Sequence, residues 1–277
     1  MSNQEIDIVV QTFNNLAFTK KFVNSLFANT THPFRLIIND NVSTDGTVEY
    51  LKSLEKKKSN IKVLYHAIPD SGTSEGYNNA FKESTSDLTV MCGNDMIFFK
   101  NDWLDKLEEC IEKDKNIAIV GCKLLYPNGL IQHAGTYLTA PFLQRQWQIP
   151  SVWEHIGRFQ PSIKYSKRRE MGGVTASCIL FRRKIFGLFD QGYRIGTYDD
   201  IDKCVDVKQR GFKIWYAGDV NVYHFEAATL RNLPPPIFQD AMISNYKRFI
   251  LKNGDWLLKD YIRDPKMYQP VEDNELP

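Results

Sequence analysis

The first half of the chain alternates between two kinds of hydrophobic pattern. Short apolar, β-branched runs bounded by polar residues predict buried strands. These runs occupy 6–12, 34–40, 61–66, 87–93 and 117–125. Between them, apolar residues recur at helix spacing, as at Phe22, Val23 and Leu26. Strands that alternate with helices predict βαβ units and an α/β fold, in which a mostly parallel sheet is flanked by helices.

The pattern changes in the second half. The predicted elements are a strand at 172–183, a helix at 200–211, two short strands within 212–225, a proline-led amphipathic helix from 234 and a short helix near 255–262. Residues 139–170 are rich in prolines, aromatic residues and basic residues. A loop of this length is either functional, here as an acceptor-binding flap, or a solvated connection, and both interpretations stay open.

Polar residues follow several of the predicted strands. Thr12 ends the first strand, Asn39 and Asp40 end the second, and Asn94 and Asp95 follow the fourth. In open parallel sheets, ligands bind beyond the carboxyl ends of the strands. We therefore expect these side chains to converge on one crevice.

Composition narrows the classes of protein. The chain has 277 residues, 43% of them hydrophobic and 25% charged, with a formal charge of +2. This near-neutral balance gives no strong attraction to nucleic acid or membranes. Five scattered cysteines without C-x-x-C spacing indicate reduced thiols. With no long apolar run, we expect a cytoplasmic protein without a transmembrane segment, with peripheral recruitment to a membrane left open.

Several nucleotide-binding motifs are absent. No G-x-G-x-x-G follows the first strand, and the chain has no G-x-x-x-x-G-K-[ST]. This disfavours Rossmann dehydrogenases and P-loop enzymes. An acidic stretch, "TYDDIDKCVD", begins the helix at 200–211. Carboxylates at a helix N-terminus are favoured by its free N–H groups, so this stretch is either a helix start or a site that needs a base near a cation.

Five stretches, taken in order, resemble the family 2 glycosyltransferases, inverting enzymes of the GT-A fold. They are "VVQTFNNLAFTKKFVNSL", "INDNVSTDGTVEYL", "SGTSEGYNNAF", "LLYPNGLIQHAG" and "TYDDIDKCVDVKQRGFKIWYAGDVNVYHF". The fourth is similar to a stretch of bacterial rhamnosyltransferase-like members. The resemblance covers about residues 5–230 and implies transfer of one sugar from a nucleoside-diphosphate sugar, with UDP or dTDP as the expected nucleotide, to an acceptor hydroxyl.

The resemblance also assigns catalytic and metal-binding residues. The acidic pair Asp199 and Asp200 matches the family's catalytic base position, and we expect Asp200 to be the base, because a carboxylate can accept the proton of a sugar hydroxyl. Asp95 matches the metal-contacting end of a D-x-D-like motif, and His224 matches a position that completes the metal shell. Mn²⁺ or Mg²⁺ is the implied cofactor. Gly93 stands where the first Asp or Asn of the motif normally lies, a departure from the family pattern.

The nucleotide and acceptor positions follow by the same match. The resemblance places a group of residues near the base, ribose and phosphates of the donor: Thr12, Phe13, Asn14, Asp40, Gly72, Asn78 and Asn94. Thr175 and Ala176 match the strand that borders the acceptor, and His133 is expected in packing or acceptor-side support. The expected acceptor is a glycan, and a nucleic acid acceptor is disfavoured.

We expect a catalytic domain over 1–230, with a nucleotide-binding half at 1–125 and an acceptor-side half at 126–230. The extension at 231–277 completes the acceptor side or forms a homodimer contact. Two alternatives are kept. A non-catalytic nucleotide- or sugar-binding module is suggested by Gly93. A sugar-1-phosphate nucleotidyltransferase would have a related sheet, but the glycine-rich phosphate loop of that class is missing after the first strand.

Overall fold

The computed structural model describes residues 4–66, 68–69, 72–139, 152–225 and 234–270. Within these residues, a ten-stranded sheet has the order β10-β12-β6-β11-β4-β1-β2-β3, with β5 beside β12 and β7 beside β6, and β8 pairs with β9 separately. The strands are β1 Ile6–Thr12, β2 Phe34–Asp40, β3 Ile61–Tyr65, β4 Leu88–Gly93, β5 Met96–Ile97, β6 Ile117–Leu125, β7 Ile131–His133, β8 Thr136–Leu138, β9 Trp153–His155, β10 Arg169–Glu170, β11 Cys178–Arg182 and β12 Lys213–His224.

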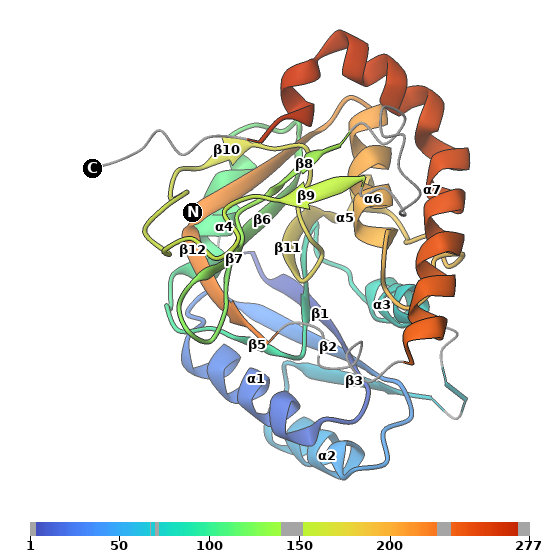
Figure 1. The fold of residues 1–277 in the computed structure, drawn as a ribbon. Coiled ribbons are helices and arrows are strands. Elements are labelled where there is room, and N and C mark those ends of the chain that lie inside the picture. Colours follow the sequence, from blue (N-terminus) through green and yellow to red (C-terminus); the bar gives the residue numbers. More distant parts are fainter. Residues whose placement is uncertain (1–3, 67, 70–71, 140–151, 226–233, 271–277) are drawn as a thin grey trace.

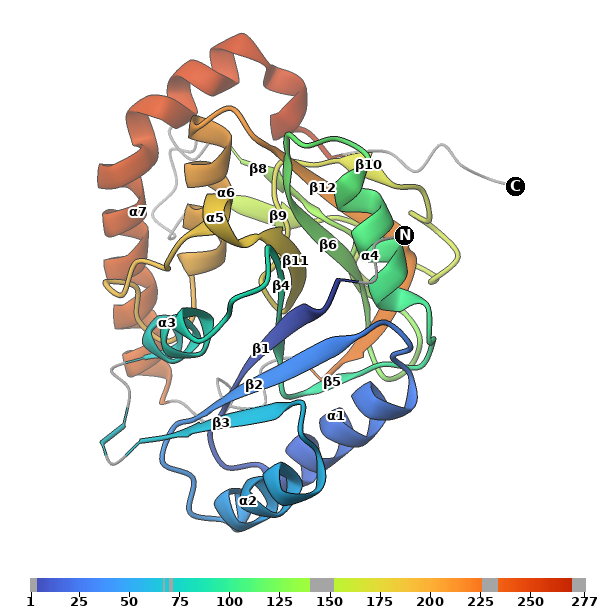
Figure 2. The ribbon, with the colours of Figure 1, turned by 180° about the vertical axis from the view of Figure 1, so that it is seen from behind.

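Helices cover both faces of this sheet. They are α1 Leu16–Ala28, α2 Thr47–Lys57, α3 Thr73–Lys82, α4 Trp103–Glu112, α5 Arg183–Phe186, α6 Asp199–Gln209 and α7 Pro235–Arg263, and a 3₁₀ turn follows at Pro265–Tyr268. Figures 1 and 2 show α1, α2 and α4 on one side of the sheet, and α3, α6 and α7 on the other. Strands β1 to β4 pair in parallel, as do β6 and β12. The prediction of an α/β fold with a helix-flanked sheet is confirmed. The sheet is mixed, because β5, β7, β10 and β11 pair antiparallel with their neighbours.

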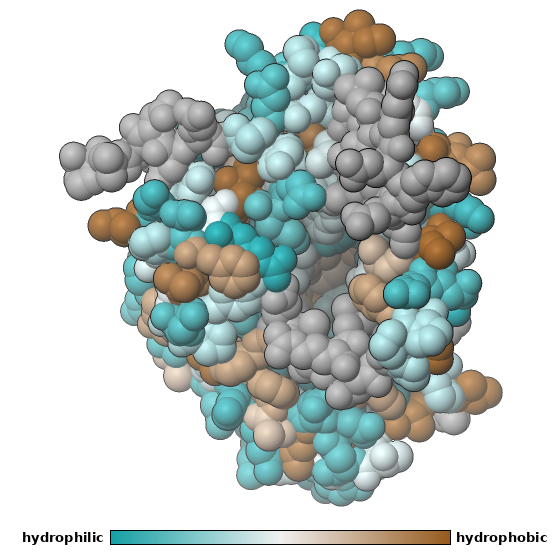
Figure 3. Space-filling view, in the orientation of Figure 1, coloured by the Kyte–Doolittle hydropathy of each residue, from teal (hydrophilic) through white to brown (hydrophobic). Residues whose placement is uncertain are grey.

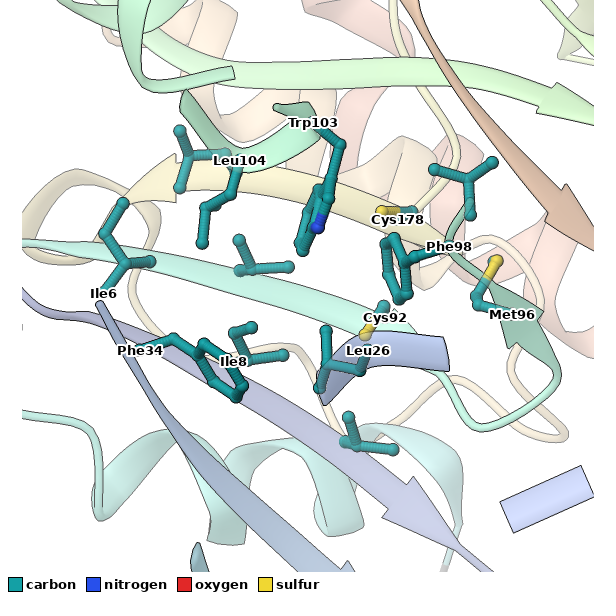
Figure 4. Close-up of a cluster of buried hydrophobic side chains, with 14 of the residues drawn as sticks. Ile6, Ile8, Leu26, Phe34, Cys92, Met96, Phe98, Trp103, Leu104 and Cys178 are labelled. Atoms are coloured by element: carbon teal, nitrogen blue, oxygen red, sulfur yellow. The ribbon is translucent and has the colours of Figure 1, made fainter. Parts of the chain in front are cut away.

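Two hydrophobic clusters hold these layers together. One joins the sheet to α1, α2 and α4, and it includes Ile8, Leu26 and Leu104 (Figure 4). In it, the rings of Phe98 and Trp103 stack with centroids 4.2 Å apart. The other cluster joins the opposite face of the sheet to α3, α5, α6 and α7. Because the central strands are buried on both faces, they consist of continuous apolar runs.

The predicted strand at 172–183 is shorter than expected and antiparallel. Strand β11 begins only at Cys178 and pairs antiparallel with β4 and β6. Before it, the backbone groups of Gly173 bond to those of Thr136, so residues 172–177 leave the sheet. This leaves Thr175 and Ala176 on a loop, which the apolar pattern did not reveal.

Two other boundaries were wrong. Residues 213–224 form one strand, because a register shift between Ala217 and Asn221 lets it bend without ending. A Cβ on Gly218, inside this bend, would lie 2.3 Å from the carbonyl oxygen of Tyr165, so the glycine permits that approach. Helix α7 continues through Gly254, where two helices were predicted. The adjacent buried Asn253 bonds to Asp202, and such tertiary contacts outweigh a glycine cost of about 1 kcal/mol.

Candidate active site

A pocket of about 400 Å³ lies where the carboxyl ends of β1 and β4 meet the N-terminus of α6. The face of the molecule seen in Figure 1 is hollowed near its centre (Figure 3). Nine of the predicted site residues line the pocket: Phe13, Gly72, Asn94, Asp95, Thr175, Ala176, Asp199, Asp200 and His224. A larger hollow, of about 840 Å³, lies near the opposite ends of these strands, beside Ile6 and Leu88, and contains none of them.

The acidic pair begins α6. The Asp199 carboxylate is buried and accepts a hydrogen bond from the Ser74 hydroxyl of α3 at 3.0 Å. The Asp200 carboxylate accepts bonds from the backbone N–H groups of Ile201 at 2.8 Å and Ala176 at 3.4 Å. The two interpretations of the acidic stretch, as a helix start and as a functional site, are therefore compatible. Asp199 and Asp200 lie in the first turn of α6 and also line the pocket.

The environment shifts the protonation of this pair. Burial, together with the neighbouring Asp199 carboxylate, raises the pKa of Asp200 to about 7. Burial likewise raises the pKa of Asp199, although the Ser74 bond opposes the shift. A carboxyl group with a pKa near neutral can both accept and release a proton at physiological pH, which suits a general base.

Asp95 and His224 meet on the same pocket. Asp95 Oδ1 lies 3.4 Å from His224 Nε2. Gln132 Nε2 donates to the His224 carbonyl at 3.5 Å, which turns Gln132 Oε1 toward His224 Nδ1, 2.5 Å away. The proton of a neutral imidazole is then on Nδ1, and Nε2 directs its lone pair at the carboxylate. Two acceptors facing each other are stabilised by a cation between them.

These two residues fit a divalent metal with few protein ligands. Among the described residues, no group of three or more histidine, cysteine, aspartate or glutamate side chains could hold a metal. Mg²⁺ and similar cations are commonly held by one or two protein side chains plus substrate phosphates. The pair Asp95 and His224 would therefore supply only part of the shell of such a cation, and the remaining ligands would have to come from outside the protein.

The absence of a side chain at position 93, next to this pair, has a steric explanation. A Cβ built on Gly93 would lie 2.6 Å from Asp95 Oδ1. The Asp95 carboxylate thus occupies the space that a side chain at Gly93 would need. The glycine at position 93 and the observed position of the Asp95 carboxylate therefore depend on each other.

The predicted nucleotide residues divide into two groups. Phe13 is 46% exposed on the pocket, whereas Thr12 and Asp40 are buried beneath it. The Asp40 carboxylate accepts hydrogen bonds from the Thr12 hydroxyl and the Ser43 backbone, each at 3.0 Å. Asn14, with a φ of 52°, accepts a bond from the Thr44 backbone at 2.8 Å. Thr12, Asn14 and Asp40 therefore join the loops beside the pocket without lining it.

The other three predicted nucleotide residues have different surroundings. Nothing lies within 4 Å of a Cβ built on Gly72, and its φ of 171° suits any residue, so the protein itself does not require a glycine there. Asn94 lines the pocket and donates to the Thr19 hydroxyl at 3.1 Å. Asn78 is buried and exchanges two hydrogen bonds with the backbone of Phe189, away from the pocket lining.

The acceptor-side prediction involves a histidine pair. Thr175 and Ala176 line the pocket, and the Thr175 N–H points at His133 Nε2, 3.5 Å away. His133 Nδ1 lies 2.9 Å from His155 Nδ1. Burial, with His155 and His224 nearby, lowers the pKa of His133 well below its ordinary value, so its ring is neutral. The neutral His133 ring can thus accept the Thr175 N–H, so it supports the loop that carries Thr175 and Ala176. Residues 140–151 of the predicted flap lie outside the described residues.

Sequence reasoning missed several residues of the pocket. Gln11, Tyr77 and Ile195 line it, and Gln132 orients His224 from 92 residues away. A glutamine inside "LIQHAG" carries no signal for such a role, since the contact exists only after β7 and β12 have both paired with β6. A Cβ on Gly76 would lie 2.3 Å from Gln11 Nε2, so that glycine makes room for the Gln11 side chain.

Comparison with known protein families shows to which family the chain belongs. The family model of glycosyl transferase family 2 matches residues 7–189, about two-thirds of the chain. The chain belongs to glycosyl transferase family 2. This assignment confirms the resemblance to the family. Four of the five sequence stretches lie within the matched residues, and the fifth, at 197–225, lies beyond them.

Curated relatives of this family 2 chain are distant. It is 27% identical over 229 residues to the protein y4gI of Sinorhizobium fredii, covering 81% of this chain and 25% of that protein. It is 25% identical to the O-antigen biosynthesis protein RfbC of Myxococcus xanthus, covering 82% and 18%. It is 24% identical to the N-acetylglucosaminyl-diphospho-decaprenol L-rhamnosyltransferase of Mycobacterium tuberculosis, covering 80% and 76%. The chain thus spans a quarter or less of the first two relatives.

Solved structures of similar fold include two glycosyltransferase complexes. GalNAc-T7 with UDP, GalNAc and Mn²⁺ has a TM-score of 0.69 at 15% identity, covering 89% of this chain and 48% of that one. S. aureus TarS with UDP-GlcNAc has a TM-score of 0.61 at 16% identity, covering 90% and 67%. These likenesses confirm the predicted GT-A type fold for the family 2 chain. In the part of the chain that the structure describes, no helix combines the length and apolar character needed to cross a membrane.

Proposed function

We propose that this chain is a metal-dependent inverting glycosyltransferase, which moves one sugar from a nucleoside-diphosphate sugar to an acceptor hydroxyl. The observation that carries the proposal is one pocket holding both a carboxylate with a pKa of about 7, Asp200, and the facing pair Asp95 and His224. Family membership supports it independently.

In this reaction Asp200 accepts the proton of the attacking hydroxyl. The hydroxyl oxygen forms a bond to the anomeric carbon as the bond from that carbon to the diphosphate oxygen breaks, and the nucleoside diphosphate leaves with the electron pair. Asp199 stays in place through Ser74 and keeps the pKa of Asp200 high. A divalent cation, when bound by Asp95 and His224, would neutralise charge on the leaving diphosphate.

The donor side is assigned to the β1 and β4 ends of the pocket. Phe13 and Asn94 line it there, and the open space over Gly72 suits close approach of a ligand. The acceptor side is assigned to Thr175 and Ala176. The names of the relatives support a glycan or lipid-linked glycan acceptor. The UDP-GlcNAc bound in TarS supports UDP as the donor nucleotide, whereas dTDP rests on the sequence resemblance alone. Residues 1–230 form the catalytic domain in this proposal, and the C-terminal extension completes it.

The test is turnover of a donor panel: UDP-N-acetylglucosamine, GDP-mannose and dTDP-L-rhamnose with Mn²⁺. Release of a nucleoside diphosphate is followed for the wild type and for Asp200→Asn. Asp206→Asn is the matched control, because Asp206 lies on the same helix but pairs with Arg210 outside the pocket. We expect turnover to fall by about 10²- to 10⁴-fold in Asp200→Asn alone.

The same panel separates the two alternatives. A nucleotide-dependent rise in Tm without turnover of any donor would favour a non-catalytic binding module. Pyrophosphate release from a nucleoside triphosphate and a sugar 1-phosphate would favour a nucleotidyltransferase. Equal loss of turnover in the Asp200 and Asp206 variants would refute Asp200 as the base.

A further inference from the structure

The segment that leads into the acidic pair is backbone-strained. Ile195, Gly196 and Tyr198 have φ angles of 54°, 63° and 70°. The left-handed region is unfavourable for a side chain with a Cβ, and most of all for a β-branched residue such as Ile195. Ile195 and Gly196 line the pocket, and Asp199 follows directly. Strain of this kind persists only where surrounding contacts hold it.

Asn245 of α7 supplies such contacts. It is 0% exposed, and within the described residues its amide bonds only to this segment. Its Nδ2 donates toward the carbonyl of Arg194 at 2.8 Å, the carbonyl of Thr197 at 3.0 Å and the hydroxyl of Thr197 at 2.8 Å. Its Oδ1 accepts the Arg194 N–H at 3.0 Å. The side chain of Asn245 therefore hydrogen-bonds to both ends of residues 194–197, although it is about fifty residues later in the sequence.

Packing closes the segment from two sides. The ring of Tyr198 lies against Phe249 and Tyr246 of α7, with centroids 5.8 and 6.5 Å apart. On the other side, a Cβ on Gly196 would come within 2.9 Å of the Thr73 hydroxyl at the start of α3. The segment is thus wedged between α7 and α3, so its position depends on α7.

We propose that Asn245 is a positioning residue for the acidic pair, and that α7 is for this reason part of the catalytic unit. The inference rests on the proposed transferase function. Asn245 lies outside the matched family region of residues 7–189. It touches neither acid, but it fixes the backbone from which Asp199 reaches Ser74 and Asp200 reaches the pocket. Displacement of a catalytic group by about 1 Å can cost about 10²-fold in rate.

The experiment compares Asn245→Ala with Asn253→Ala. Asn253 is a matched control because it is 2% exposed on the same helix and bonds to α6 at Asp202 and Gln209, not to residues 194–198. Asn245→Ser, which keeps a single hydroxyl donor one bond nearer the backbone, is the second variant if the alanine variant does not fold. Donor turnover is measured across pH with the nucleotide sugar of the panel that the wild type uses best.

For the Asn245 variant we expect kcat to fall by about 10²-fold, with the KM for the donor changed by less than about threefold. The apparent pKa of the rate profile should also move downward, because a loosened segment admits water to Asp200. The Asn253 variant should keep both the rate and the profile of the wild type. A purely structural role would lower the yield or Tm of both variants alike and leave the profile unmoved.

Equal kcat and equal pH profiles in the two variants would overturn the inference while the proposed function stands. Absence of turnover in the wild type, with every donor of the panel, would overturn the proposed function and this inference with it. The two failures are therefore distinguished by the wild-type measurement made alongside.

Discussion

Replacing Asp200 by asparagine should change stability as well as activity, and in a pH-dependent way. The pKa of Asp200 is about 7 in the folded chain, against an ordinary value of 3.8. The folded chain therefore holds a proton that the unfolded chain releases between these two values. The wild type loses stability as pH rises from 3.8 through 7, whereas an asparagine has no proton to lose.

The magnitude follows from the size of the shift. Each pKa unit corresponds to about 1.36 kcal/mol, so the raised pKa of Asp200 costs the wild type about 2 kcal/mol at pH 5, where only the unfolded chain ionises, and about 4 kcal/mol at pH 8. The asparagine variant should thus gain about 2–3 kcal/mol relative to the wild type between these pH values. The bond accepted from the Ala176 N–H is weakened in the variant, but this cost of about 1–3 kcal/mol applies equally at both pH values.

The assay is urea unfolding of the wild type, Asp200→Asn and Asp206→Asn at pH 5 and pH 8. The control should show no such pH-dependent gain, because Asp206 forms ion pairs near the surface with Lys203 and Arg210. A difference in the free energy of unfolding between Asp200→Asn and wild type that is the same at both pH values would refute the reasoning. It would mean that Asp200 is not kept protonated by its surroundings.

Four further outcomes are expected. In wild type, kcat/KM should fall about tenfold per pH unit below about 7, as Asp200 gains its proton; a flat profile from pH 5 to 8 would exclude it as the base. Asp95→Ala and His224→Ala should each abolish a Mn²⁺-dependent rise in Tm with UDP or dTDP, whereas an unchanged rise would place the metal elsewhere. Gly93→Ala should weaken the same response, because its Cβ would displace the Asp95 carboxylate; an unaltered Mn²⁺ titration would count against this. Lys123→Met should lower the free energy of unfolding by about 1–3 kcal/mol or more, because the carbonyls of Ser162 and Lys164 and the hydroxyl of Ser166 lose the donor that the buried Lys123 supplies, and urea unfolding measures it; a loss below about 0.5 kcal/mol, on the order of a surface change, would contradict it.

Much of the fold was predictable because its signals are local. The apolar runs that became β1, β2 and β4 are short and bounded by polar residues, which is typical of strands buried on both faces. The direction of β11 was not predictable, since an apolar run is the same whether its neighbours are parallel or antiparallel. The continuity of α7 through Gly254 depended on packing against α6, which no local propensity contains.

The candidate site divides in the same way. Asp199, Asp200, Asp95 and His224 were assigned through the resemblance to the family 2 glycosyltransferases, and the fold brings all four to one pocket. The structure also showed that Asp40 is enclosed by Thr12 and Ser43, an arrangement that depends on two loops meeting.

The sequence by itself determined the alternation of strands and helices, the family and the chemically competent side chains, because each is written in residue type and short spacing. Only the tertiary structure decided which atoms meet: Gln132 with His224, and Asn245 with the segment before the acids. Those contacts join residues tens of positions apart. Burial and the neighbouring charge of Asp199 also set the pKa of Asp200. Both arise only when the chain folds, so the sequence around Asp200 does not contain them.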